Sequence, residues 1–177
     1  LVRHPRRDPG VYREAPDFLR IYLKKARYAL ILFDREGCSQ EERSVEELEE
    51  DLRRRLEENG WHGRCGVIAL DPELENWVWS PSPHISKVLG VSGPNELARL
   101  TKASWLQDRE KPDRPKETLE KVLRHSKRPL SPRIFQELAE KVSLSRCKDP
   151  SFQRFKHLLQ TWFSEAGGID DKEDFSH

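Results

Sequence analysis

The chain of 177 residues contains no methionine, only three cysteines and no long apolar run. No stretch reaches the roughly 20 apolar residues of a membrane-spanning helix, so we expect no association with a membrane. Cys38, Cys65 and Cys147 are widely spaced and form no C-x-x-C pair. This gives little support to a zinc site or a disulfide framework, and it fits the reducing cytoplasm. Because methionine is absent even from the first position, we expect Leu1 either to reflect an unusual start codon or to follow a missing N-terminal portion.

Several functional signatures are also missing. The sequence has no glycine-rich loop of the kind that cradles phosphates, and no serine or cysteine nucleophile has a recognisable histidine base. The six histidines lack the spacing of zinc ligands. The 32 basic and 31 acidic residues leave a net charge of +1. Any electrostatic attraction to nucleic acid must therefore be local.

Two short apolar segments, Ala29–Gly37 (ALILFDREG) and Gly66–Trp77 (GVIALDPELENW), each stop at an acidic residue. The stretch between them, Ser44–Asn59, has the period of an amphipathic helix and starts with a capping box formed by Ser44 and Glu47. This order predicts a strand–helix–strand unit with parallel strands and a right-handed crossover. We therefore predict an α/β fold with a short, mainly parallel sheet flanked by helices, followed by an all-helical C-terminal half.

The remaining segments are predicted to be loops and helices. The basic, proline-rich opening, Leu1–Gly10, is expected to be a loop, and a helix is expected from Pro16 to about Arg27. Helices are expected to start at capping residues followed by proline, at Asp71-Pro72, Ser131-Pro132 and Asp149-Pro150. Further short helices are expected at Pro83–Gly90, Pro94–Leu106 and Pro115–His125.

We predict three regions along the chain. Residues 1–106 form the α/β core with trailing short helices, residues 107–165 a helical C-terminal region, and residues 166–177 a flexible acidic tail. The boundary between the first two is expected in the charged loop Gln107–Arg114.

Acidic residues follow both predicted strands. Asp34 and Glu36 come after the first strand, and Glu73 and Glu75 come after the second. The carboxyl ends of parallel strands share one edge, where ligands bind in open α/β sheets. Because Mg2+ prefers carboxylate oxygens, these four residues are the predicted metal ligands, and Asp34, Glu36 and Glu75 are the predicted catalytic residues. The alternative is that Asp34 caps a turn and that Glu73 and Glu75 lie in the first turn of a helix, where the helix dipole favours acidic residues.

A basic segment, Lys111–Arg133, contains eight basic and three acidic residues. Such a surface can contact phosphates, although a solvated face is the alternative interpretation. The group Arg3, Arg6, Arg7 and Arg13 can extend it. The predicted nucleic-acid contacts are Lys111, Arg114, Lys116, Arg124, Lys127 and Arg128.

Four stretches of the sequence, LILFDREGC, DPELENWVWSPSPH, KPDRPKETLE and RCKDPSFQRFKHLLQTWF, together resemble a small prokaryotic family linked to a methylation-associated anti-phage defence system. The acidic D-x-E after a strand, followed by P-E-L-E-x-W, also resembles the Toprim-type fold of proteins found near restriction genes. The resemblance implies Mg2+ binding by Asp34 and Glu36, which would match a D-x-D pair, with Glu75 as an accessory acid. The early strand that carries a glutamate in Toprim domains has no counterpart here, so it is either lost or lies upstream of Leu1.

Two functions follow from these patterns. The first is a cytoplasmic defence component with Mg2+-dependent phosphodiester chemistry on DNA or RNA. The second is a non-catalytic subunit that binds other defence-system subunits through a helical face rich in tryptophan and arginine.

Overall fold

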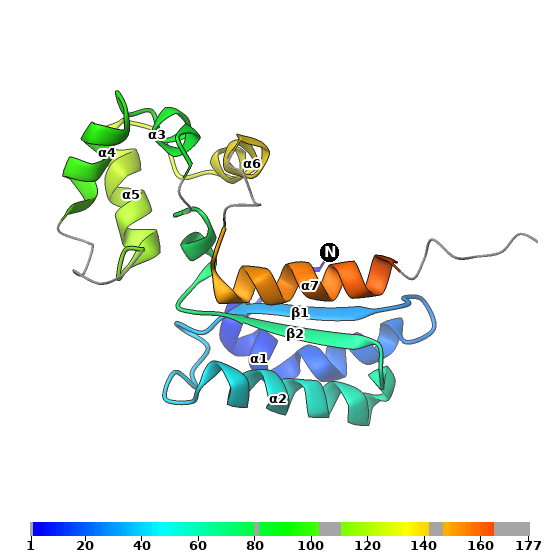
Figure 1. Cartoon of the computed structure of the whole chain (residues 1–177). Helices are drawn as coiled ribbons and strands as arrows, with labels where there is room; N and C mark the ends of the chain where they lie inside the picture. Colours follow the sequence, from blue (N-terminus) through cyan, green and yellow to red (C-terminus); the bar gives the residue numbers. More distant parts are fainter. Residues whose placement is uncertain (1, 80–81, 103–110, 142–146, 165–177) are drawn as a thin grey trace, which may run out of the picture.

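A computed structural model describes residues 2–79, 82–102, 111–141 and 147–164. The chain forms an α/β layer, then a group of short helices, and its last helix returns to the layer (Figure 1). The elements are α1 (Arg7–Leu19), η1 (Arg20–Tyr22), β1 (Ala29–Asp34), α2 (Val45–Leu56), η2 (Glu57–Trp61), β2 (Cys65–Leu70), η3 (Leu74–Trp77), α3 (His84–Leu89), α4 (Pro94–Thr101), α5 (Pro115–His125), α6 (Pro132–Lys141) and α7 (Pro150–Ser164).

The predicted strand–helix–strand unit is confirmed. β1 and β2 pair in parallel, with Ala29 opposite Cys65 and Asp34 opposite Leu70. The connecting helix α2 begins with the predicted capping box, since Ser44 and Glu47 each accept a backbone N–H from the other. A turn after α2 places Gly60 at φ +96°, where a side chain would be strained. The α/β class and the parallel sheet therefore stand as predicted.

Helices cover both faces of the two strands. α1 and α2 lie on one side, where Tyr12, Leu48 and Leu52 pack against Ile31 and Phe33 (Figure 1). α7 lies on the other side and crosses β2 at Gly66. A Cβ atom built on Gly66 would overlap Leu158 Cδ2 and would lie 3.2 Å from Trp162 Cη2. The absence of a side chain at Gly66 thus allows α7 to contact the sheet closely.

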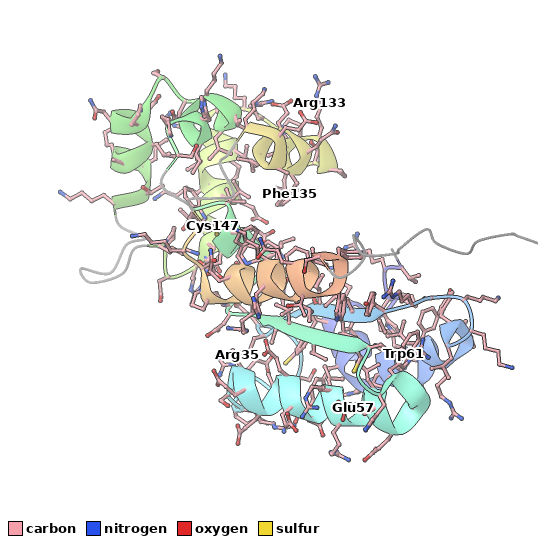
Figure 2. All side chains as sticks on the ribbon, turned by 45° about the vertical axis from the view of Figure 1, so that its right-hand side comes forward. Arg35, Glu57, Trp61, Arg133, Phe135 and Cys147 are labelled. Carbon is pink, nitrogen blue, oxygen red and sulfur yellow. The ribbon has the colours of Figure 1, made fainter. Side chains whose placement is uncertain are left out.

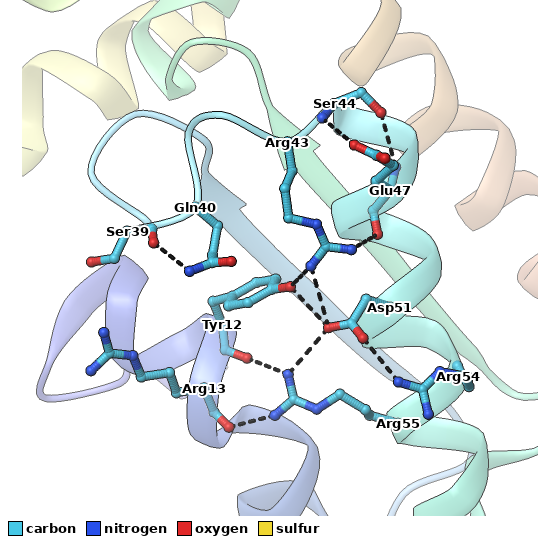
Figure 3. A network of polar contacts seen from close by, with 10 residues as sticks. All are labelled: Tyr12, Arg13, Ser39, Gln40, Arg43, Ser44, Glu47, Asp51, Arg54 and Arg55. Atoms are coloured by element: carbon cyan, nitrogen blue, oxygen red, sulfur yellow. Dashed lines mark hydrogen bonds and ion pairs between the residues drawn. The ribbon is translucent and has the colours of Figure 1, made fainter.

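The first helix differs from the prediction, because α1 starts at Arg7 within the expected loop and ends at Leu19. Pro16, the expected helix start, lies inside α1 and leaves the carbonyl of Tyr12 without a helical donor. The guanidinium of Arg55 on α2 donates to that carbonyl at 2.8 Å and also to the carbonyl of Arg13 (Figure 3). A distant side chain therefore compensates for the proline.

A second set of contacts holds α1 against α2. The Tyr12 hydroxyl donates to Asp51 Oδ2 at 2.9 Å, and Arg43 donates to the same hydroxyl (Figure 3). Asp51 also pairs with Arg54 at 3.0 Å. Because the contacts of Tyr12 join residues more than 30 positions apart, sequence periodicity does not reveal them.

The helices after β2 build a second apolar core. It contains Val88 and Leu89 of α3, Leu119 and Val122 of α5, and Ile134 of α6, among others. These helices lie beyond the carboxyl end of the strands (Figure 1), and Figure 2 shows the α6 residues Arg133 and Phe135 far from Trp61.

Several predicted helix boundaries are confirmed. α5 spans Pro115–His125 as predicted, and the helices that start at Pro132 and Pro150 are also present. α4 ends at Thr101, and residues 103–106 of its predicted range lie outside the described residues, as do residues 107–110 of the predicted boundary loop.

The prediction of a helix starting at Asp71-Pro72 is wrong. A short 3-10 turn, Leu74–Trp77, takes its place, and Asp71 does not cap it. The Asp71 carboxylate instead lies 3.3 Å from Arg35, a residue of the loop after β1. The ion pair to the neighbouring strand end therefore replaces the predicted capping contact.

No helix in the described ranges has the length and apolar character that crossing a membrane requires.

We predict that Gly66→Ala destabilises the protein by about 1–3 kcal/mol, because the new methyl group overlaps Leu158. Chemical denaturation of Gly66→Ala, Leu158→Ala and the double variant measures this. The double variant should lose less stability than the sum of the two single variants, since shortening the side chain at position 158 leaves room for the methyl group. Additive losses would contradict the proposed contact.

Candidate functional site

The acidic residues after the two strands do lie near one another. The carboxylates of Glu73 and Glu75 interact electrostatically with Asp34, and a fourth acid, Asp8 at the start of α1, also acts on Asp34. The backbone N–H of Asp34 donates to Asp8 Oδ1 at 3.0 Å. We call Asp8, Asp34, Glu73 and Glu75 the acidic cluster. The parallel strand order explains it, because β1 and β2 end at the same edge.

Within the acidic cluster, Asp34 has the pKa that is shifted furthest from its ordinary value. Burial and the negative charge of Asp8 raise the pKa of Asp34 to about 7, and the charges of Glu75 and Glu73 add to the effect. A hydrogen bond from the backbone N–H of Leu74 to Asp34 Oδ1, 2.9 Å long, opposes this rise in the pKa. The carboxyl group of Asp34 is therefore poised to exchange its proton near neutral pH.

Glu73 connects the acidic cluster to the helical part of the chain. Its Oε1 accepts the backbone N–H of Lys116 in α5 at 2.7 Å. Burial raises the pKa of Glu73, the hydrogen bond from Lys116 lowers it, and the charges of Glu75 and Glu36 raise it further. Glu36 itself is exposed, and its backbone N–H donates to the carbonyl of Pro72. Glu36 therefore lies at the rim of the cluster.

Glu75 is the least explained carboxylate. Its residue is only 8% exposed, and within the described ranges its carboxylate has no hydrogen-bond donor and no cation at ion-pair distance. Among the described residues, the fully buried side-chain atoms without a hydrogen-bond partner are Trp61 Nε1 and Arg154 Nε, so the carboxylate oxygens of Glu75 keep contact with solvent. The acidic cluster therefore contains one solvent-accessible carboxylate that no described donor or cation pairs with.

The acidic cluster does not form a complete metal site. Among the residues that the structure describes, no group of three or more histidine, cysteine, aspartate or glutamate side chains is arranged to hold a metal ion. Two of the four predicted ligands, Asp34 and Glu73, already accept a backbone N–H each. At most, the present carboxylates can supply part of the coordination shell of a hard cation.

A polar cavity of about 810 Å³ lies beside the acidic cluster, at the same edge of the sheet. The loop after β1, the loop after β2, the start of α2 and the start of α7 all contribute to it. Charges in its lining balance, because four basic side chains face four acidic ones. They are Arg35, Lys111, Lys148 and Arg154, and Glu46, Asp71, Asp113 and Asp149.

Asp149 organises the floor of this cavity. The residue is 3% exposed, and its carboxylate accepts from Lys111 Nζ at 2.7 Å, from Asn76 Nδ2 at 2.7 Å and from the backbone of Ser151 and Phe152. Burial alone would raise the pKa of Asp149, but the hydrogen bonds from Lys111 and Ser151 outweigh burial and lower the pKa. Asp149 therefore caps α7, as predicted, and also joins three separate segments.

Basic residues of the predicted nucleic-acid surface have different environments. Lys111 pairs with Asp149 inside the cavity, and Arg128 donates to the Val88 carbonyl and pairs with Glu137. Arg114 forms a surface pair with Glu117. The other three, Lys116, Arg124 and Lys127, are exposed. Two of the six predicted contacts are thus less exposed and held in ion pairs, and four are exposed.

The cavity depends on residues that sequence patterns did not single out. Arg35 bridges the two strand ends, and Arg154 pairs with Glu49 at 2.9 Å and donates to the Ala69 carbonyl. The cap signal at Asp149-Pro150 was visible in the sequence, but the partners Lys111 and Asn76 lie too far away in sequence to be inferred. Asp8, which accepts the backbone N–H of Asp34, lies in the segment that was expected to be a loop.

Comparison of the chain with family models, with curated proteins and with solved structures finds no match. The acidic cluster and the cavity must therefore be interpreted from their own chemistry.

We predict that Asp34→Asn stabilises the protein at about pH 8 and that this gain shrinks as the pH falls toward 5. The folded-state pKa of about 7 lies above the ordinary value of 3.8, so the folded protein binds the proton more tightly than the unfolded chain. The charged form therefore weakens folding above the folded-state pKa, and protonation removes that cost as the pH falls. The asparagine oxygen can still accept from Leu74.

Thermal unfolding of the wild type and of Asp34→Asn across this pH range measures the effect. Asp17→Asn, a change at an exposed aspartate of α1, serves as the control and should show no such pH-dependent gain. A gain for Asp34→Asn that does not vary with pH would contradict the raised pKa.

Proposed function

We propose that the chain is a component of a prokaryotic anti-phage defence system that acts on a phosphodiester of DNA or RNA with the help of Mg2+. The proposed site is the carboxyl edge of the sheet, where the acidic cluster and the polar cavity adjoin. Asp34 and Glu75 are the proposed metal ligands, Glu73 orients them, and Glu36 contributes from the rim.

The observation that carries this proposal is the carboxylate of Glu75, which lies near Asp34 and has no donor or cation partner in the described part of the chain. Their environment combines burial with mutual repulsion, which a divalent cation would relieve. Structural ion-pair networks pair each acid with a base, whereas neither Asp34 nor Glu75 forms an ion pair within the described part of the chain.

The incomplete donor set is compatible with Mg2+. This ion is often held by only one or two carboxylates together with waters and the phosphates of a substrate. When bound, it would polarise a phosphoryl oxygen and neutralise developing negative charge. The residues of this chain would supply the rest: Asp34, with a pKa of about 7, would give up its proton to bind the ion, and Arg35 and Lys148 face the adjoining cavity, where phosphates can lie.

Charge balance in the cavity limits how it can bind. Because four cations face four acids, the cavity attracts an anion only through individually placed groups and not through its net charge. A ligand phosphate that enters beside Arg35 would therefore compete with Asp71 for the Arg35 guanidinium. This favours a ligand that brings its own cation, such as a Mg2+-bound phosphodiester.

The family proposal rests on the sequence resemblance given above. We propose that the α/β layer is a reduced Toprim-like domain in which β1 and the acids after it take the place of the D-x-D strand. The proposed partners are other subunits of the same defence system.

We predict that Mg2+ raises the thermal midpoint of the wild type and that Glu75→Gln abolishes this rise, because the amide removes the negative charge that would bind the ion. Thermal unfolding with and without Mg2+ measures the binding, and cleavage assays on DNA and RNA measure the reaction. Glu58→Gln in η2 removes an exposed glutamate of a surface ion pair and is the matched control, which should respond to Mg2+ as the wild type does. If Glu75→Gln responds to Mg2+ like the wild type, the metal proposal is wrong.

A second function is favoured by one specific observation. Asp34 and Glu73 accept backbone N–H groups from η3 and α5, so both acids also fix the helical part against the sheet. This is expected of a non-catalytic subunit whose acids only position a partner-binding helical face. Absence of a Mg2+ response together with absence of cleavage would support this second function.

A further inference from the structure

An aromatic cluster lies at the amino edge of the sheet, at the end opposite the acidic cluster. Tyr28, the residue before β1, stacks on Trp162 of α7, with ring centres 4.6 Å apart and an angle of 7° between the rings. Phe163 meets Tyr28 edge to face at 6.0 Å. Trp162 is buried, but Phe163 is 62% exposed. The cluster thus presents a large aromatic ring to solvent on a rigid support.

Positive charge precedes this aromatic cluster in the sequence. The segment Phe18–Tyr28 contains Arg20, Lys24, Lys25 and Arg27 and no acidic residue. All four are exposed, and none forms an ion pair within the described residues. The guanidinium of Arg27 lies 5.2 Å from the centre of the Tyr28 ring. This arrangement combines cations and rings without a neutralising partner in the described part of the chain.

α7 contributes to the same charge pattern. It contains Arg154, Lys156 and His157 and no acidic residue. Lys156 is exposed and lies seven positions before Phe163, so both residues share one face of the helix. Figure 1 shows the end of α7 above the loop that leads into β1. The segment Phe18–Tyr28 and α7 therefore both carry basic residues and no acidic residue.

From these contacts we propose that the Tyr28–Trp162–Phe163 cluster and the cations of residues 20–27 form a platform for single-stranded nucleic acid. Bases stack on exposed aromatic rings whatever their sequence, while lysine and arginine contact the phosphates. A duplex hides its bases from such a ring, so the exposed Phe163 favours a single strand.

The platform is distinct from the proposed Mg2+ site. β1 separates them by six residues, or about 20 Å at the rise of a strand. Binding to the platform needs no metal, and its test can be run without one. A negative result for Mg2+ binding at Glu75 would therefore leave the platform proposal unaffected, and the reverse also holds.

The test uses fluorescence anisotropy of a labelled oligothymidylate of about 20 nucleotides, enough to span a typical binding site, in the presence of EDTA. It uses the full chain, because residues 165–177, which follow α7, are acidic in sequence. The wild type should bind this probe more tightly than a duplex of the same length.

Phe163→Ala should weaken binding of the oligothymidylate roughly five- to hundredfold, the range of one lost base–ring stack. Phe163→Trp should retain the affinity. Leu130→Ala, which shortens another exposed apolar side chain, 42% exposed, is the matched control and should leave the affinity unchanged. Equal losses in Phe163→Ala and Leu130→Ala would overturn the platform.

The double variant Lys24→Gln/Lys25→Gln should reduce the slope of log affinity against log salt by about 1.4, since each lost phosphate contact removes about 0.7. Lys87→Gln/Arg99→Gln removes two exposed cations from α3 and α4 and should change the slope less. Glu58→Gln should bind the probe as the wild type does. No binding at low salt, or tighter binding of the duplex, would overturn the proposal, and a partner protein would then be the occupant of this edge.

Discussion

The close contact between α7 and β2 at Gly66 determines how this chain is organised. Two parallel strands have two faces to bury, and α1 and α2 cover only one of them. The last helix must therefore return from the helical part and lie across the other face. Because Gly66 has no side chain, Leu158 and Trp162 can reach the backbone of the strand. Both ends of α7 are thereby fixed at opposite edges of the sheet.

That placement gives one helix two roles. At its start, Asp149 and Arg154 line the cavity at the carboxyl edge, and Asp149 links Lys111, Asn76 and the helix itself. At its end, Trp162 stacks on Tyr28 and Phe163 faces solvent. The net charge of +1 conceals this arrangement, because acids gather at one edge and cations without an ion pair in the described residues gather at the other.

Local patterns predicted the parts of the fold that local interactions decide. The strand–helix–strand unit, the capping box of Ser44 and Glu47 and the bounds of α5 all follow from short-range periodicity and caps. The start of α1 could not be predicted, because Arg55, far along the chain from Pro16, supplies the donor that the proline lacks. A proline rule describes the helix alone, whereas the folded protein satisfies its carbonyls from elsewhere.

The same division applies to the candidate site. Parallel strand order was enough to bring Asp34, Glu73 and Glu75 to one edge, since each acid follows a strand end. It did not predict that Asp8 would join them or that Asp71 would turn toward Arg35. Those contacts depend on where α1 starts and on how the loops after the strands fold.

The acids of the cluster differ in the hydrogen bonds that they accept. Asp34 and Glu73 have backbone donors, so part of the cost of burying them is offset by hydrogen bonds that also hold η3 and α5 in place. Glu75 has neither donor nor cation in the described part of the chain, yet it is nearly as buried as Glu73. A purely structural role explains the first two acids, whereas the third forms no hydrogen bond or ion pair that would hold the described part of the fold together. A role in holding a cation explains all three, because the two anchored acids then fix the geometry around the one that is left to bind.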